Sequence, residues 1–361
     1  MKRLSSVQRI AWIRLSQQRE RKHLTRLKKK ALSRKQYSPT TVNPLNYIQA
    51  PKVFSLREKV LHKKLIQFIV KIKTSVLKNK QRIKIDFSQT EQMVVCGSLY
   101  FFAELENIKK ELGSLNLISC TCPKNETVAQ VLQHLGILTM LKCRCSVKPE
   151  RDDVINWKVA FGEKTDATKV GKILESQSDL PTVKAKKLYR GVSEAMTNVS
   201  QHAYIEIENG IETPLDNKGW WMFYREENER IIVAFCDLGV GIPITLPYTM
   251  KKNHEESLFQ QVLQHIFPNR KKYSDGELIH AAIEVKRSRT RHSHRGKGLL
   301  DMIKVLENIP DGELTILSNR GMYEYKRYNS QVSEKHKNYK ESISGTLIIW
   351  SLPLINNLGN T

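Results

Sequence analysis

The sequence has no long apolar run, and this excludes several classes of protein. No stretch approaches the ~18 consecutive apolar residues that a membrane-spanning helix needs. The first residues lack the uninterrupted apolar segment of a secretory signal. Acidic residues are also scarce, since 36 Asp and Glu stand against 60 Lys and Arg and leave a net charge of +24. The sequence therefore predicts a soluble, cytoplasmic protein, and its surplus of basic residues would suit an acidic partner.

Cysteine is also scarce, with six residues in 361. Four of them form two Cys-x-Cys pairs, Cys120/Cys122 and Cys143/Cys145. Zinc sites more often use wider spacings, whereas alternate residues of a strand simply share a face, where cysteine is common as a buried residue. The pattern favours buried free thiols, as expected in a reducing compartment, with a metal site as the alternative.

The length predicts more than one domain, and charge and proline mark the boundaries. Residues 1–35 contain thirteen Lys and Arg and one acid, Glu20, a net charge of +12. This basic arm reads as a helix that binds nucleic acid, binds an anionic membrane or packs on its own protein. Pro39 and Pro44 mark a linker. We expect an arm and linker over 1–44, one domain over 45–150 and another over 151–361.

Helical and strand patterns alternate between residues 45 and 150, which predicts a small α/β domain. We expect helices over 56–78, 92–112 and 127–135, and strands over 83–87, 115–120 and from 137 to 141. The run from Ile83 to Ser88, a helix, then Ile118 to Pro123 and a further helix to Gly136 resembles the anti-sigma-factor antagonist (STAS) fold. That family carries a phosphorylatable Ser or Thr at the start of the helix after the strand. Ser88, Thr90 and Ser98 lie near this position, but none of them is in the family's usual motif.

One helix, residues 188–204, carries a row of polar side chains. Glu194, Asn198 and His202 recur every four residues and share a helical face. The opposite face is an apolar stripe, Leu188, Val192, Ala195, Met196 and Val199. A carboxylate can accept a proton and an amide oxygen can bind Mg²⁺, so the row suits a pocket. The alternative is a solvated polar face.

Three glycine-containing turns follow the helix. Asp237-Leu-Gly-Val-Gly ends a predicted strand, and Gly239 and Gly241 let the backbone approach a flat ligand while Asp237 accepts an amine. Gly296-Lys297-Gly298 opens a predicted helix, where free amides and Lys297 suit a phosphate. Thr346 follows Gly345 at the start of the last predicted strand. No Walker A or Rossmann glycine motif is present. A long polar stretch, 248–294, predicts a mobile cover over the site.

In this order and spacing, the four motifs resemble the GHKL ATPase superfamily, which includes histidine kinases and anti-sigma-factor kinases. The resemblance implies a two-layer α/β sandwich with a mixed sheet, with ATP between the central helix and a lid. It implies that Asn198 binds Mg²⁺, that Glu194 is the general base, and that His202 belongs to the nucleotide site. It also implies adenine binding by Asp237, with Gly239, Gly241 and Thr346 around it, and phosphate binding by Gly296, Lys297 and Gly298.

Several functions stay open at this level. His62 lies in Leu-His-Lys-Lys, which is not the phosphoacceptor motif of a histidine kinase, and no histidine in such a motif is found. Within the superfamily, the chain most resembles a stand-alone anti-sigma-kinase-like domain. One hypothesis is an enzyme that hydrolyses ATP or transfers its γ-phosphate to a protein. Another is a nucleotide-gated binding module that engages nucleic acid through residues 1–35, and a pseudo-ATPase is a third. A protein partner and a second copy of the chain are the other expected partners.

Overall fold

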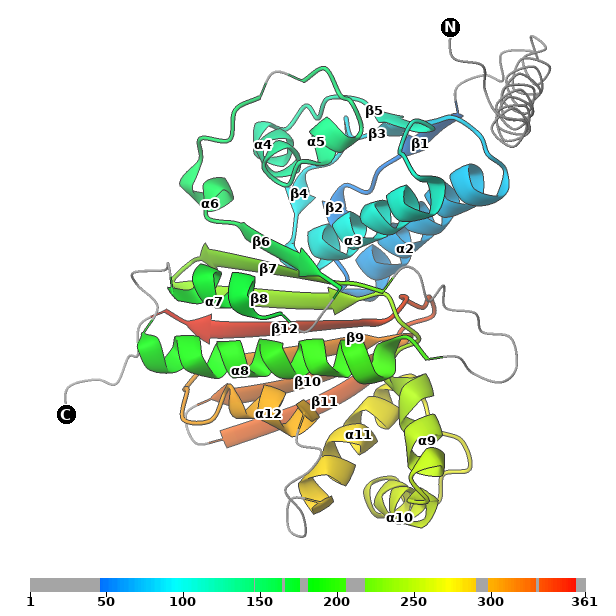
Figure 1. Ribbon diagram of the computed structural model, residues 1–361, viewed down its shortest axis with the longest axis vertical. Helices are drawn as coiled ribbons and strands as arrows, with labels where there is room; N and C mark the ends of the chain where they lie inside the picture. Colours follow the sequence, from blue (N-terminus) through cyan, green and yellow to red (C-terminus); the bar gives the residue numbers. More distant parts are fainter. Residues whose placement is uncertain are drawn as a thin grey trace, which may run out of the picture. The chain divides into compact units, whose positions relative to one another are not determined.

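A seven-stranded sheet is the centre of the fold (Figure 1). The computed structural model describes residues 46–145, 147–163, 166–175, 181–205, 218–289, 298–328 and 331–354, so the predicted basic arm lies outside it. The strand order is β11-β10-β9-β12-β8-β7-β6. Their bounds are β6 Lys158–Gly162, β7 Trp220–Glu227, β8 Arg230–Asp237, β9 Glu313–Ser318, β10 Gly321–Tyr328, β11 Gln331–Asn338 and β12 Thr346–Pro353.

Every neighbouring pair in this sheet is antiparallel. The predicted mixed sheet is therefore wrong. The short polar turn between β7 and β8 makes a hairpin, and β9, β10 and β11 follow one another as a meander. Strands joined by such short turns run antiparallel, because parallel neighbours need a crossover of a dozen or more residues.

Both faces of the sheet are buried, and β7 shows why its sequence is apolar throughout. Trp220, Met222 and Tyr224 belong to one core cluster, whereas Trp221 and Phe223 belong to the other. Alternate residues of a strand point to opposite faces, so a continuous apolar run is what a sheet covered on both sides requires. The central strands are thus shielded by two layers of helices rather than by one.

Helices of the C-terminal half cover one face. Here α8 (Thr182–Asn198) continues into a π-helical turn, η2 (Val199–Ala203), and lies across the sheet beside α12 (Gly298–Lys304) (Figure 1). The α8 helix comes close to α12 because Gly191 has no side chain; a Cβ there would lie 2.6 Å from Cγ2 of Val305. The remaining helices of this half are α7 Thr168–Glu175, α9 Ile242–Lys252, α10 Glu256–Ile266 and α11 Asp275–Arg289.

The N-terminal half, from residue 46, contains two smaller parallel sheets. Strands β1, β3 and β5 pair in the order β1-β3-β5, and β2 pairs with β4. The strands are β1 Asn46–Gln49, β2 Val53–Phe54, β3 Ile83–Asp86, β4 Gln92–Met93 and β5 Ile118–Cys120. The helices are α2 Lys59–Lys73, its π-helical extension η1 Thr74–Lys78, α3 Val95–Leu112, α4 Glu126–His134, α5 Ile137–Met140 and α6 Asp152–Ile155.

The predicted strand from residue 137 is wrong, since this segment is the short helix α5. Gly136, at φ 72°, ends α4 and begins α5 in a left-handed conformation that glycine adopts freely. Ile137 and Leu138 are fully buried in the core. A short apolar run cannot by its pattern be told apart as strand or helix, and here the tight turn at Gly136 leads straight into a helix.

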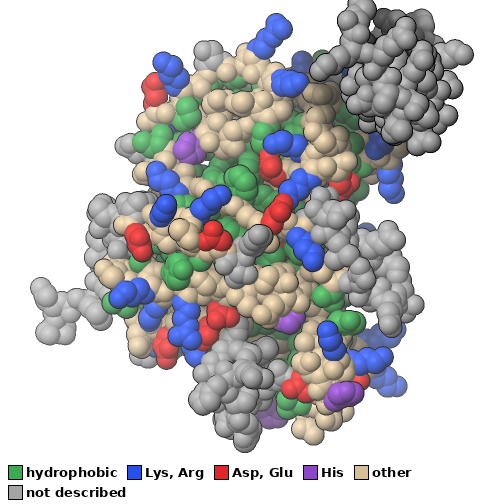
Figure 2. Space-filling view, in the orientation of Figure 1, with side chains coloured by type: hydrophobic (Ala, Val, Ile, Leu, Met, Phe, Trp, Pro, Cys, Tyr) green, Lys and Arg blue, Asp and Glu red, His purple; other side chains and the backbone are tan. Residues whose placement is uncertain are grey.

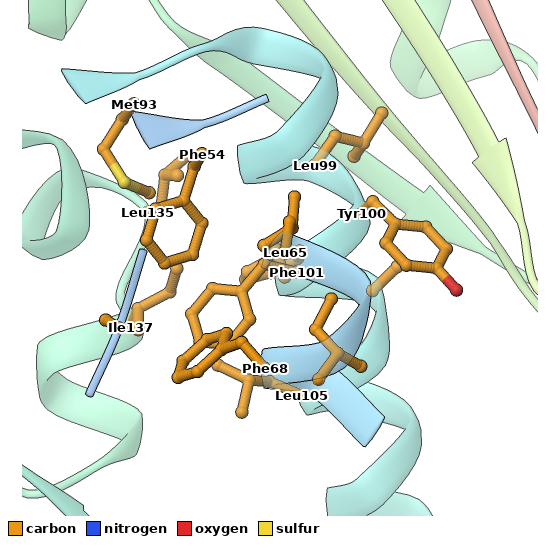
Figure 3. Close-up of a cluster of buried hydrophobic side chains, with 14 of the residues drawn as sticks. Phe54, Leu65, Phe68, Met93, Leu99, Tyr100, Phe101, Leu105, Leu135 and Ile137 are labelled. Atoms are coloured by element: carbon orange, nitrogen blue, oxygen red, sulfur yellow. The ribbon is translucent and has the colours of Figure 1, made fainter. Parts of the chain in front are cut away.

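The core of this half is continuous with one face of the large sheet. Phe54, Phe68 and Phe101 pack with ring centroids 5.3–5.8 Å apart (Figure 3), and the same cluster extends to Phe223 of β7, 5.8 Å from Phe102 of α3. Residues 46–361 form one compact unit. Within the described residues, none of the helices combines the length and the apolarity needed to cross a membrane.

Candidate functional site

The polar row of α8 does not face uniformly outward. Asn198, the last residue of α8, and His202, within the π turn η2, both line a cavity, and both are half-buried. The opposite stripe is buried as predicted, with Leu188, Val192 and Ala195 at most 1% exposed. The π turn adds a residue to the helical repeat, a local change that is common at functional sites. The helix therefore presents an amide and an imidazole to the cavity.

Asp237, at the end of β8, lies in the same cavity and is 5% exposed. Its Oδ1 accepts a hydrogen bond from the amide of Gly239 over 2.8 Å. Burial raises the pKa of Asp237 to about 7, although backbone hydrogen bonds from Gly239 and Thr346 favour the carboxylate. A buried carboxyl group of this kind is suited to pairing with the amine of a flat heterocycle.

The glycines after Asp237 are needed where the chain passes other backbone. A Cβ on Gly239 would lie 2.2 Å from the carbonyl oxygen of Ala203. Gly241, at φ 89°, has a conformation that side chains rarely adopt, and a Cβ there would lie 2.0 Å from Oδ1 of Asn319. The two glycines thus let the turn fit between η2 and the end of β9.

Two residues that the sequence did not indicate hold this turn. Ser318 is fully buried; its Oγ accepts from the amide of Ile242 over 2.9 Å and lies 3.0 Å from Oγ1 of Thr346. Asn319 donates from Nδ2 to the carbonyl oxygen of Val240 over 3.0 Å. Ser318 is the last residue of β9 and Asn319 follows it, so their only signal in the sequence is a polar pair at a strand end.

The cavity encloses about 780 Å³ of space free of protein atoms, part of it open to solvent. Its lining is mostly apolar with a few polar groups, as is typical of small-molecule sites. The described lining residues come from α8, η2, β8, the following turn, α9, α11, α12 and β12. They are Ala195, Asn198, His202, Ala203, Phe235, Asp237, Gly241, Ile242, Thr245, Leu246, Thr249, Met250, Ala282, Leu299, Met302, Thr346 and Ile348.

The structure thus brings Asn198, His202, Asp237, Gly241 and Thr346 around one cavity. Glu194 stands one turn before Asn198 on α8, half-buried, and is not among the described lining residues. Gly239 shapes the turn without lining the cavity. Gly298 begins α12, and its neighbour Leu299 lines the cavity. Gly296 and Lys297 lie outside the described residues.

The segment predicted as a cover is largely helical. Through Thr245, Leu246, Thr249 and Met250, α9 lines the cavity, and α11 does so through Ala282. Gly241 and Pro243 start α9, because a proline in the first helical turn lacks only an amide that would be unpaired there. The polar composition between residues 248 and 289 hid apolar positions such as Phe259 and Leu263, which are buried.

A polar cluster lies on the far side of α11. His280 and Glu284 of α11 and Glu334 of β11 are close enough for one metal ion. Arg287 already pairs with both Glu284 and Glu334, the latter over 2.7 Å, and Tyr323 donates to Glu334 over 2.7 Å. With both carboxylates neutralised, the cluster is better described as an ion-pair network that attaches α11 to the sheet.

Two of the three candidate phosphate acceptors are buried. Thr90 is 1% exposed and donates to the carbonyl oxygen of Pro51 over 3.0 Å, and Ser98 is fully buried and donates to Val94 over 2.8 Å. Hydroxyl groups held inside in this way are not accessible to a kinase. Ser88 is half-buried in the turn that follows β3.

The cysteines differ from the sequence-based expectation. Cys122 and Cys145 are joined in a disulfide, and Cys122 is exposed, so the prediction of buried free thiols is wrong for this pair. Cys120 is a buried free thiol, as predicted, and Cys96 and Cys236 are also free and buried. The prediction of free thiols failed for this pair because the Cys-x-Cys spacing does not show which distant segment lies next to each motif.

In comparisons with known proteins, no family model matches the chain, and no curated protein is significantly similar to it in sequence.

Proposed function

We propose that this protein binds Mg-ATP in the manner of the GHKL superfamily and hydrolyses ATP or transfers its γ-phosphate to a protein partner. The observation that carries the proposal is the meeting of Asp237 and Asn198 at one cavity, from a strand end and a helix of the same core. Adenine would enter the apolar part and pair with Asp237 and Thr346. The helices α9 and α11 would form the lid of a GHKL-type sandwich. Residues 45–150 would form a STAS-like domain.

The residues present fit the ligand. Asp237 supplies a buried acceptor for the adenine amine, and Gly241 keeps the neighbouring wall free of a side chain. The amide oxygen of Asn198 is a suitable ligand for Mg²⁺, which would neutralise phosphate charge. Glu194, one turn away, would take the proton from the attacking water or hydroxyl as the bond from the bridging oxygen to the γ-phosphorus breaks. Gly296, Lys297 and Gly298 would contact phosphates.

The test is to incubate the full chain with γ-labelled ATP and Mg²⁺ and to follow the label. Label released as free phosphate indicates hydrolysis, and label on this chain or on a co-purified protein indicates phosphotransfer. Asp237→Ala should abolish retention of adenine nucleotide, whereas Asp311→Ala, an exposed acid in the loop before β9, should not. A purified wild-type protein that retains no adenine nucleotide contradicts the proposal.

A second candidate function, a nucleotide-gated module that engages nucleic acid, is favoured by the surface of α2, η1 and β3. Between residues 57 and 84 there are ten Lys and Arg and one acid, Glu58. Lys63, Lys64 and Lys71 are exposed, and the described residues offer them no ion-pair partner. Figure 2 shows Lys and Arg side chains spread over the visible face, with Asp and Glu among them. Such a surface suits phosphates, whose neutralisation releases counterions.

A further inference from the structure

The two Cys-x-Cys pairs meet in the N-terminal half. Cys120 is the last residue of β5, and Cys122 lies two residues beyond it; Cys143 and Cys145 follow α5. Cys122 and Cys145 are bonded, with Cα atoms 5.5 Å apart. The thiol of Cys143 lies 3.8 Å from the carbonyl oxygen of Cys120. Each cysteine of one motif therefore stands against its counterpart in the other, 23 residues away.

The backbone places the two cysteines of the first motif on one side. Thr121 continues the pairing with β3, since its amide donates to the carbonyl oxygen of Ile85 over 2.9 Å. Its side chain faces β3, where Oγ1 donates to Asp86 over 2.9 Å and accepts from the amide of Phe87 over 3.0 Å. In an extended chain, successive side chains point to opposite sides, so those of Cys120 and Cys122 point away from the side that Thr121 faces. Cys120 and Cys122 therefore share the face that meets Cys143 and Cys145.

The disulfide accounts for only half of this arrangement. It uses Cys122 and Cys145 and leaves two free thiols, Cys120 and Cys143, which interact with each other and are each two residues along the chain from a bonded cysteine. We propose that in the reduced chain all four sulfurs bind one zinc ion, as a closed structural Cys₄ site. Reduction of the disulfide by a dithiol, which is itself oxidised to a disulfide, supplies two electrons and two protons and yields four thiols. Zinc binding then displaces the four thiol protons, and no ligand position stays open for catalysis.

The charges around the four sulfurs fit this assignment. A zinc ion with four thiolates carries a net charge of −2, which nearby cations stabilise. Lys124 follows the first motif by two residues, Lys142 and Arg144 flank Cys143, and Lys84 of β3 acts electrostatically on Cys120. The side chain of Lys142 donates a hydrogen bond from Nζ to Oδ1 of Asn116 over 2.7 Å. Each motif thus has basic side chains in its immediate neighbourhood.

The position of the cluster gives the metal a structural role. The described residues just after β5, 121–125, and those after α5, 141–145, are neither helix nor strand. They join at the cysteines and enclose α4 and α5. A metal that ties two irregular segments together contributes directly to folding, which is the usual role of closed zinc sites. This inference does not depend on nucleotide binding.

The experiment uses the full chain, purified with a reducing agent and zinc, then freed of unbound metal. Elemental analysis should find about one zinc per chain, and cobalt in its place should give the absorption of tetrahedral thiolate coordination. Cys120→Ser, Cys143→Ser and the double variant Cys122→Ser/Cys145→Ser should lose the metal. Cys96→Ala, a buried cysteine of α3 outside the cluster, should retain it.

Because a variant can fail to fold, the reduced wild-type chain is tested as well. A strong chelator should lower its melting temperature, and added zinc should restore it. A reduced chain that holds no zinc and shows no cobalt absorption would overturn the proposal and leave the disulfide as the sole role of the cluster. Zinc that survives the loss of Cys120 and Cys143 would overturn it equally.

Discussion

The amide of Val240 donates to the carbonyl oxygen of Ala203 over 2.8 Å. This bond joins the end of the π turn η2 to the turn after β8, two segments more than thirty residues apart. Tyr204 adds to the junction, since its hydroxyl accepts from the amide of Leu238 over 3.3 Å. The cavity side chains Asn198 and His202 on one segment and Asp237 on the other are thereby held in fixed relation. The geometry of the candidate site depends on this junction.

The first prediction concerns the junction itself. In Gly239→Ala the new methyl group would lie 2.2 Å from the carbonyl oxygen of Ala203, which is backbone and cannot swing away. We expect a loss of roughly 2 kcal/mol in the free energy of unfolding, together with weaker nucleotide binding. Urea denaturation and nucleotide titration measure the two effects.

Gly171→Ala in α7 is the matched control. Its nearest neighbour would be a ring carbon of Tyr189 at 3.4 Å, an ordinary contact with a side chain. We expect this variant to be as stable as the wild type or more so, because alanine favours helix. If both variants lose the same stability, close approach at Gly239 is not the reason.

The second prediction separates chemistry from binding. Glu194→Gln should reduce ATP turnover by roughly 100-fold or more while nucleotide affinity stays near that of the wild type, because an amide cannot act as a general base. Asn198→Ala should instead weaken Mg²⁺-dependent binding. Single-turnover assays and equilibrium titration measure these two quantities.

Glu175→Gln, at the exposed end of α7, is the control for the same chemical change. If cellular function survives Glu194→Gln but not Asn198→Ala, nucleotide binding without turnover is sufficient. Unchanged turnover in Glu194→Gln would remove this residue from the proposed mechanism.

The third prediction follows from the raised pKa of Asp237, about 7 after burial. In the unfolded chain an aspartate ionises near pH 3.9, so between about pH 4 and 7 the folded state holds a proton that the unfolded state has lost. This group therefore stabilises the fold below about pH 4, and its contribution falls as the pH rises to 7. In Asp237→Asn that slope should disappear.

Denaturation of the wild type and Asp237→Asn at several pH values measures the difference. We expect the wild type to lose up to a few kcal/mol relative to the variant between pH 4 and pH 7, and no more above pH 8. A constant difference across this range would show that the Asp237 carboxyl group ionises normally.

The fourth prediction concerns the attachment of α11. Burial disfavours the ionised form of Glu334, but hydrogen bonds from His280, Arg287 and Tyr323 outweigh it and lower the pKa to about 2. The folded pKa is below that of the unfolded chain, so stability from this group is complete above about pH 4.3 and is lost as the pH falls to 2. Glu334→Gln should lower the free energy of unfolding by roughly 1–3 kcal/mol at pH 7. It should also reduce the loss of stability between about pH 4.3 and pH 2.

Glu91→Gln is the comparison, because Glu91 pairs with Lys52 only at the surface, where both side chains are at least 60% exposed. Its effect should be within about 1 kcal/mol. Acid denaturation of the three proteins gives the measurement, and equal slopes for wild type and Glu334→Gln would contradict the network's contribution.

The fifth prediction tests the basic surface. Reversing Lys63 and Lys71 of α2 to Glu should weaken nucleic acid binding and lower its dependence on salt, since each phosphate contact contributes to the slope. Reversing Lys251 and Lys252 of α9, which are equally exposed, changes the net charge by the same amount. If the two double variants behave alike, net charge rather than this surface accounts for binding.

Local elements were largely predictable. The apolar stripe of α8, the strands β7, β8, β9 and β12, and the helices α2, α3 and α4 all have patterns set by neighbours two, three or four residues away. The turn at Gly241 was indicated because its φ of 89° requires glycine. These features depend on local steric preferences and on the periodicity of apolar residues, and both can be identified in a short stretch of sequence.

Contacts between distant residues were not predictable in the same way. Ser318 and Asn319 contact the turn after Asp237 from another strand, and Cys122 meets Cys145 across two helices. The antiparallel order of the sheet places β12 between β8 and β9. These pairings cannot be predicted from a local sequence pattern. They are selected because, over the whole sheet, they bury apolar surface and leave few backbone groups without a hydrogen bond. Residue order established which groups were available; packing of the complete chain decided which of them meet.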